Sequence, residues 1–170
     1  MFCGGPGVME FPFLVGEMDR RALLRAGGAA FALLAIGGCG RAASPAGPQT
    51  MLVYRDPGCG CCEAWTELAR QSGFAVQAVE HPDMAGLKRS KRVPDQLASC
   101  HTALVGGYVI EGHVPLEAVT RLLAARPAGL VGIAVPGMPR GSPGMEMPDG
   151  ARDPFEVIAF TKHGATKVFG

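Results

Sequence analysis

The hydrophobic and polar positions from Met51 onward follow two different spacings. Short apolar runs bounded by turn-forming residues predict strands at 51–54, 74–79, 102–105 and 108–110. Apolar positions three and four residues apart predict helices at 61–71, 84–92 and 115–126. The predicted order is therefore strand, helix, strand, helix, a hairpin of two strands, and a last helix.

This order indicates the fold class. A βαβ unit followed by a ββα unit is the pattern of the thioredoxin fold, so the sequence predicts an α/β, thioredoxin-like domain over 51–170. In that fold the first helix begins where the active cysteines lie. Residues 128–154 show no periodicity and are rich in Gly, Pro and Met, which predicts a long irregular loop. Apolar runs at 155–160 and 166–169 predict a C-terminal β-hairpin.

The beginning of the chain has the pattern of an export leader. Arg20, Arg21 and Arg25 precede an uncharged, mostly apolar stretch at 26–38. This stretch has the length of a signal-peptide core, and it is short for a membrane span, which needs about 20 apolar residues. We expect a leader over 1–38, with Met18 as its true start.

The segment Ile36-Gly37-Gly38-Cys39 resembles a bacterial lipobox. On this interpretation Cys39 becomes the lipidated first residue of the mature protein, and 39–50, rich in Ala, Pro, Ser and Gly, is a flexible tether. The alternative is an ordinary signal peptide cut near Ala43. The sequence predicts an exported lipoprotein whose contact with the membrane is its N-terminal lipid.

Charge and composition narrow the class of partner. Hydrophobic residues make up 48% of the chain and charged residues 18%, which is ample for a core. The net charge is +1, and the basic residues are scattered. The densest basic group, between Lys88 and Arg92, is typical of a solvated helix surface, so we expect no nucleic-acid partner.

Four of the six cysteines fall within the predicted domain. Cys59, Cys61 and Cys62 form a CxCC motif between the first strand and the first helix, and Cys100 stands before the predicted hairpin. Free amides and the dipole at a helix start favour thiolates at Cys59 and Cys62, the form that attacks disulfides and binds metals. This concentration of cysteines indicates a site rather than a disulfide scaffold.

Clustered thiolates select soft cations. Zinc needs a closed tetrahedron, and neighbouring Cys61 and Cys62 should point in different directions. Copper(I) accepts two or three ligands and bridging sulfurs, so we expect one or several copper(I) ions and rank zinc below copper. Cys100 should complete a four-thiolate site, because the thioredoxin layout brings its loop opposite the first helix; the alternative is a buried structural cysteine.

Other side chains are weaker candidates for copper ligation. His101 could ligate, donate a proton or pack, and His113 could ligate or only cap a helix. Met138, Met145 and Met147 lie in the irregular loop, where thioethers could bind copper(I) or simply fill gaps.

The combined motifs resemble those of the CopG-type copper-resistance proteins, over about residues 51–170. The segments that carry the resemblance are 54–62 (YRDPGCGCC), 99–103 (SCHTA), 107–115 (GYVIEGHVP), 135–139 (VPGMP) and 141–146 (GSPGME). The resemblance implies a thioredoxin-like fold, a periplasmic setting and copper handling at Cys59, Cys61, Cys62 and Cys100. It also suggests cycling between copper-bound thiolates and disulfides.

The functional expectation is therefore a periplasmic copper(I)-binding protein of copper resistance or homeostasis. Its expected partners are copper ions, other periplasmic copper-handling proteins and a thiol reductant. The alternative is a metal-independent thiol–disulfide oxidoreductase, with Cys59 attacking and Cys62 resolving. A structural zinc module would need metal in order to fold, whereas this apolar core should suffice without it.

Overall fold

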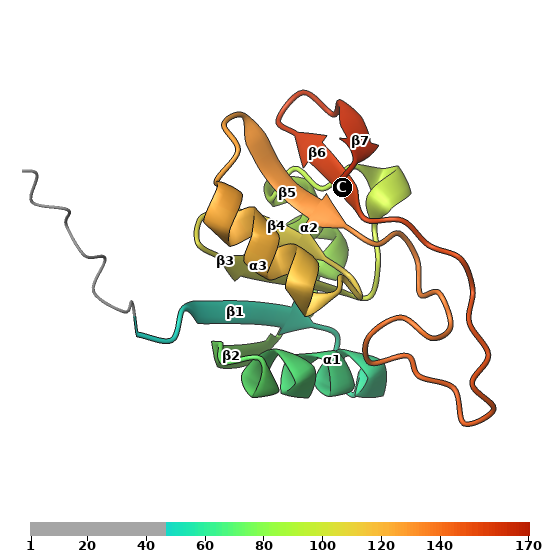
Figure 1. The fold of residues 1–170 in the computed structure, drawn as a ribbon. Coiled ribbons are helices and arrows are strands. Elements are labelled where there is room, and N and C mark those ends of the chain that lie inside the picture. Colours follow the sequence, from blue (N-terminus) through green and yellow to red (C-terminus); the bar gives the residue numbers. More distant parts are fainter. Residues whose placement is uncertain (1–46) are drawn as a thin grey trace, which may run out of the picture. The chain divides into compact units, whose positions relative to one another are not determined.

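The computed structural model describes residues 47–170 (Figure 1). The leader at 1–38, the lipidation candidate Cys39 and the tether as far as residue 46 lie outside the described residues. The elements, in chain order, are β1 (Thr50–Arg55), α1 (Gly60–Gln71), β2 (Ala75–Glu80), α2 (Met84–Ser90), the short 3₁₀ helix η1 (Asp95–Leu97), β3 (His101–Val105), β4 (Tyr108–Glu111), α3 (Leu116–Ala125), β5 (Leu130–Ala134), β6 (Ile158–Thr161) and β7 (Thr166–Val168).

One seven-stranded sheet runs through the domain in the order β2-β1-β3-β4-β5-β6-β7. β1 pairs in parallel with β2 and antiparallel with β3, and β3 and β4 form the predicted hairpin. Apart from η1, the elements before β5 therefore give βαβ, then the connecting helix α2, then ββα. The predicted α/β class is confirmed, and this order of elements is the one expected of a thioredoxin-like fold. β2 and β7 are the two edges of the sheet.

The prediction missed one strand. Residues 128–154 were expected to lack regular structure, but Leu130–Ala134 forms β5, which pairs in parallel with β4 through the crossover helix α3. Gly132 in the middle of this five-residue apolar run weakens its strand pattern. The strand forms because pairing with β4 stabilises it despite its low local strand propensity. The C-terminal hairpin of β6 and β7 is confirmed, and it extends the sheet beyond β5.

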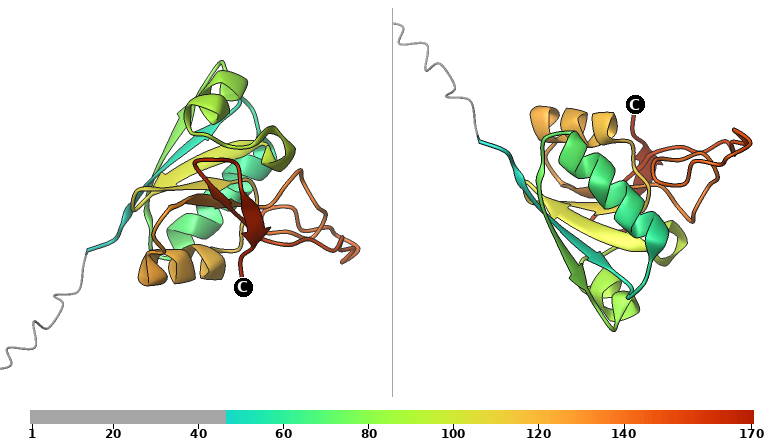
Figure 2. Two further views of the ribbon diagram at one scale, coloured as in Figure 1. Left: turned by 90° about the horizontal axis from the view of Figure 1, so that it is seen from above. Right: turned by 90° about the horizontal axis from the view of Figure 1, so that it is seen from below.

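Each face of the sheet carries its own apolar cluster. The larger cluster includes Trp65 of α1 and Leu122 of α3, packed on inward residues of the strands such as Met51. The smaller cluster joins Leu97 of η1 to Phe160 of β6 on the opposite face. The views in Figure 2 show α1 and α3 on one side of the sheet and α2 on the other.

Trp65 connects the larger cluster to the segment before α3. Its side chain is fully buried, and its indole N–H donates a hydrogen bond to the Val114 carbonyl over 2.9 Å. An aromatic of this size is a large apolar contribution, and the hydrogen bond satisfies its polar atom. The middle of α1 is thus held against the turn that follows β4. None of the helices among residues 47–170 is both long enough and apolar enough to span a bilayer.

The close approach of β4 and β5 generates a prediction about Gly132. A Cβ at this position would overlap the Val109 carbonyl and lie 2.9 Å from the Phe160 ring. We expect Gly132→Ala to lower the free energy of unfolding by about 1–3 kcal/mol, the usual cost of overpacking. Chemical denaturation measures this, with Gly47→Ala as control, since a Cβ there meets nothing within 4 Å. Equal stability of the two variants would contradict the prediction.

Candidate metal and redox centre

The start of α1 carries the CxCC motif. The turn after β1 places Gly58 at φ +73°, and Cys59 is the N-cap residue of the helix, its N–H donating to the Asp56 carbonyl over 3.3 Å. Cys61 and Cys62 lie in the first turn. All three sulfurs are therefore near the positive end of the helix dipole.

Two of these cysteines are joined. Cys59 and Cys62 form a disulfide with their Cα atoms 5.3 Å apart, while Cys61 and Cys100 are free thiols. Cys62 is fully buried and Cys59 is partly exposed. The structure is thus that of the oxidised CxxC pair, with two thiols beside it.

The four sulfurs lie together. Cys61 Sγ is 3.6 Å from Cys59 Sγ and 3.9 Å from Cys100 Sγ, and all four ligand atoms are within 4.8 Å of one another. The expectation that the sulfurs of Cys61 and Cys62 diverge is therefore wrong, because both belong to this group within 4.8 Å. Separation of the sulfurs thus gives no reason to prefer copper to zinc.

The strand register brings Cys100 to this cluster. β1 and β3 are antiparallel, with Arg55 opposite His101. The residues just after β1 and just before β3 consequently meet at one end of the sheet, and these are the CxCC turn and Cys100.

His113 faces Cys100 from the turn before α3. Its Nε2 is 2.9 Å from Cys100 Sγ, and its Nδ1 is 2.8 Å from the Pro143 carbonyl. A carbonyl only accepts, so Nδ1 carries the proton and Nε2 presents its lone pair to the Cys100 thiol. A histidine fixed by such a bond is oriented for ligation. Burial lowers the pKa of His113, although the Pro143 bond and Glu146 oppose this shift.

His101 is packed more deeply. Its ring lies 4.6 Å from that of Trp65 and 5.1 Å from that of His113, measured between centroids. Nδ1 is 3.4 Å from Cys100 Sγ, and the fully buried Nε2 has no hydrogen-bond partner among the described residues. Burial, aided by His113 and Lys88, lowers the pKa of His101 well below its usual value, so the ring is neutral. The ligand atoms of Cys100, His101 and His113 form a second close group.

Cys100 is held as a thiol. Burial, and next the neighbouring Cys61, raise its pKa to about 12. The thiol proton has an acceptor in the neutral His113 Nε2. A metal ion that binds Cys100 must therefore displace this proton.

The irregular loop after β5 lies against the cluster. A Cβ on Gly144, whose φ is +82°, would be 2.7 Å from the Trp65 backbone nitrogen and 3.1 Å from the Cys61 carbonyl oxygen, so the backbones nearly touch. Its methionines differ in exposure: Met138 and Met147 are 54% and 37% exposed, and Met145 is partly buried. The loop therefore reaches the site through its backbone, at Pro143 and Gly144.

An ion pair closes the base of this loop. The Arg140 guanidinium contacts both Asp153 carboxylate oxygens, at 2.7 Å for Nη2 to Oδ1, and the Asp153 N–H donates to the Arg140 carbonyl. This pairing lowers the pKa of Asp153 and raises that of Arg140.

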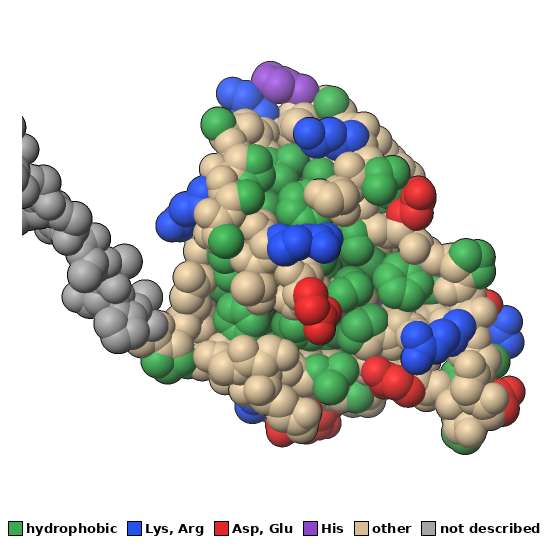
Figure 3. Space-filling model, in the orientation of Figure 1, with side chains coloured by type: hydrophobic (Ala, Val, Ile, Leu, Met, Phe, Trp, Pro, Cys, Tyr) green, Lys and Arg blue, Asp and Glu red, His purple; other side chains and the backbone are tan. Residues whose placement is uncertain are grey.

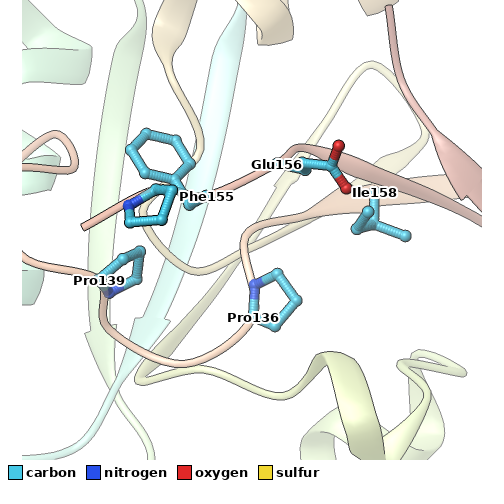
Figure 4. Close-up of a pocket in the computed structure, with 6 residues that line it drawn as sticks. Pro136, Pro139, Phe155, Glu156 and Ile158 are labelled. Atoms are coloured by element: carbon cyan, nitrogen blue, oxygen red, sulfur yellow. The ribbon is translucent and has the colours of Figure 1, made fainter.

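An apolar pocket of about 540 Å³ lies between the irregular loop and β6, and none of its lining residues is a cysteine (Figure 4). It is lined by Pro136, Pro139, Pro154, Phe155, Glu156 and Ile158.

On the face shown in Figure 3, acidic and basic side chains are interspersed among apolar ones.

Sequence reasoning missed the buried charged network behind the cysteines. Glu111 is fully buried at the end of β4, and Lys88 of α2 approaches its Oε1 to 2.6 Å. Burial raises the pKa of Glu111, and Lys88, Thr102 and the Ser99 N–H each oppose this shift. The signal available in the sequence was a glutamate in the apolar run Tyr108–Glu111, two residues before His113.

Comparison with known proteins places the chain among related structures. Residues 97–145 match the family model "Protein of unknown function, DUF411". Two solved structures, forms 1 and 2 of a copper resistance protein CopG, are each 41% identical with a TM-score of 0.68. In both cases the aligned region covers 72% of this chain, and it covers 97% of the form 2 chain and 96% of the form 1 chain. No curated protein sequence matches.

The raised pKa of Cys100 generates a prediction about its reactivity. Alkylation requires the thiolate, so with a pKa of about 12 the rate at Cys100 should rise about tenfold per pH unit from pH 8 to pH 10. Mass spectrometry of peptides from iodoacetamide-treated protein measures this rate. In unfolded protein the same cysteine should level off near pH 9. Levelling at that pH in folded protein would show that burial does not protect the thiol.

Proposed function

This chain belongs to the family of CopG copper-resistance proteins, and on that premise we propose that it binds copper(I) in copper resistance or homeostasis. The observation that supports this most directly is the grouping of Cys59, Cys61, Cys62 and Cys100, whose ligand atoms lie within 4.8 Å of one another. Sulfur ligands prefer soft ions, and the family relationship selects copper among them. The number of ions is proposed to be one or several, held by these four thiolates.

We propose histidine ligands beside the thiolates. His113 presents Nε2 with its other nitrogen engaged by Pro143, and His101 places Nδ1 3.4 Å from Cys100 Sγ. Burial keeps both rings neutral, the form that binds metal. The methionines are weaker candidates, because Met138 and Met147 are exposed to solvent.

The Cys59–Cys62 disulfide supports a redox component to this function. In the disulfide these two sulfurs have lost the charge that holds a cation, so oxidation should release copper from them. Two thiolates that become a disulfide give up two electrons, which would reduce two copper(II) ions to copper(I). A thiol reductant would then restore the four-thiol state.

The disulfide also favours a second candidate function. A CxxC pair at a helix start, with one partner exposed and the other buried, is the arrangement of a metal-independent thiol–disulfide oxidoreductase. Cys59 would then attack and Cys62 resolve. This alternative leaves Cys61, Cys100 and the two neutral histidines without a role.

We further propose that the protein is exported to the periplasm and anchored there through a lipid on Cys39. The support is the lipobox-like segment Ile36–Cys39 and the apolar stretch before it. In an oxidising compartment, a reducing partner or bound copper would be needed to keep the cluster as thiolates.

Copper binding is tested on the reduced full chain under anaerobic conditions, by competition for copper(I) with a chromogenic chelator. We expect the wild type to retain copper and Cys59→Ser/Cys62→Ser to lose most of it, because two of the four thiolates are gone. Cys39→Ser is the matched control and should bind as the wild type does. Equally weak binding by the wild type and the double variant would refute the proposal.

Cys61→Ser separates the two candidate functions. A copper cluster should lose affinity, whereas a metal-independent oxidoreductase should keep its disulfide-reductase rate, since Cys59 and Cys62 remain. Measuring insulin reduction and copper(I) competition on the same variant decides between them. Unchanged copper affinity with full reductase activity would favour the second function.

Lipid attachment is tested by growing cells with radiolabelled palmitate. The wild type should carry label and fractionate with membranes, and Cys39→Ser should lose both properties, because position 39 supplies the thioether. A variant that keeps its label would show that the lipid is attached elsewhere, while release into the periplasm of unlabelled wild type would favour an ordinary signal peptide.

A further inference from the structure

A fully buried carboxylate joins the two chain segments that carry Cys100 and His113. Glu111 Oε1 accepts from Lys88 Nζ over 2.6 Å and from the Ser99 N–H over 2.7 Å. Oε2 accepts from the Thr102 hydroxyl over 2.6 Å, and Lys88 Nζ also lies 3.0 Å from that hydroxyl. Three donors from α2, from the segment before β3 and from β3 itself thus converge on one side chain.

These contacts are adjacent to the candidate ligands. Ser99 immediately precedes Cys100, and Glu111 lies two residues before His113. The Gly112 N–H between them donates to the His101 carbonyl over 2.9 Å. The Glu111 carboxylate therefore holds the backbone next to Cys100 and the backbone next to His113. These are the two residues whose Sγ and Nε2 atoms are 2.9 Å apart.

Gly112 shows how closely the two segments approach. Its φ is +70°, and a Cβ there would overlap the Ser99 side chain and lie 2.7 Å from the Val135 carbonyl oxygen. The Ser99 hydroxyl in turn donates to the Gly137 carbonyl at the start of the irregular loop. Ser99 is thus held by its N–H, its hydroxyl and the close packing of Gly112, and this determines where the next residue points.

Stability alone does not explain a charge at this position. Well-packed apolar residues of similar size usually stabilise a protein as well as a buried ion pair does, or better. An ion pair with directed hydrogen bonds differs because each donor has one preferred position. From these contacts we infer that Glu111, paired with Lys88, is a positioning residue that holds Cys100 Sγ against His113 Nε2 for copper binding.

This inference builds on the proposed function, but one of its tests needs no copper. In the oxidised full chain the free thiols within the described residues are Cys61 and Cys100, so the ratio of their alkylation rates reports how firmly Cys100 is held. We expect Glu111→Gln to raise the alkylation rate at Cys100 relative to Cys61 by about tenfold. The variant should loosen the contact of Cys100 Sγ with His113, whereas Cys61 keeps its place on α1. Outer contacts of this kind typically change metal affinity by about 10–100-fold, and we expect a copper(I) loss in that range.

Two further variants separate positioning from general destabilisation. Leu122→Ala truncates a fully buried, wholly apolar side chain of α3 that belongs to the larger apolar cluster, and it should lower the melting temperature without changing the alkylation ratio. Thr102→Val removes one donor while keeping the ion pair, and it should shift the ratio in the same direction as Glu111→Gln by a smaller factor.

The outcomes are distinct. A folded Glu111→Gln protein with the wild-type alkylation ratio overturns the inference, and so does a Leu122→Ala protein whose ratio shifts as much. If Glu111→Gln does not fold, an unchanged ratio in Thr102→Val overturns it instead. Absence of copper binding in the wild type would refute the proposed function, and the alkylation ratios would still decide the role of Glu111.

Discussion

The antiparallel pairing of β1 with β3 is the constraint on which the candidate centre depends. Because Arg55 lies opposite His101, the turn that follows β1 and the residue that precedes β3 meet at the same end of the sheet. A slip of two residues in this register would displace Cys100 by roughly 7 Å along the strand and would separate it from Cys61, which is 3.9 Å away. The pairing of these strands brings the sulfurs together. The helix dipole, the histidines and the loop contacts then act on sulfurs that are already close.

Burial then determines the chemical state of the groups that meet. The rings of His101 and His113 are neutral, and the thiol of Cys100 keeps its proton, with burial the first cause in each case. With both imidazole rings neutral, the site repels an incoming cation less than it would if either ring were protonated. The thiol of Cys100 becomes a negatively charged thiolate only when the metal replaces its proton. The surroundings of Cys100 thus suit metal ligation better than they suit attack on a disulfide, which requires a free thiolate.

The sequence allowed the fold class to be predicted because local patterns agree with the tertiary structure. The strands and helices of the βαβ and ββα units have clear apolar periodicity, and Pro and Gly mark their ends. β5 was missed because Gly132 interrupts a short run whose strand character depends on pairing with β4. At the site, the spacing of Cys59, Cys61 and Cys62 is visible locally, and topology suggested Cys100. The roles of Glu111 and Pro143 could not be predicted, since each depends on a contact between segments that only packing brings together.

The open sheet leaves two rims whose backbone groups could pair with another molecule. At one rim β7 offers only three residues, one of them Lys167, and so short a charged strand is a poor template. At the other rim β2 is six residues long and mostly solvent-exposed, and its last residue, Glu80, is engaged by Arg55 at 3.5 Å. Any intermolecular strand addition, whether in crowded conditions or on the way to aggregation, should therefore begin along β2, at the rim next to the strand that leads into the cysteines.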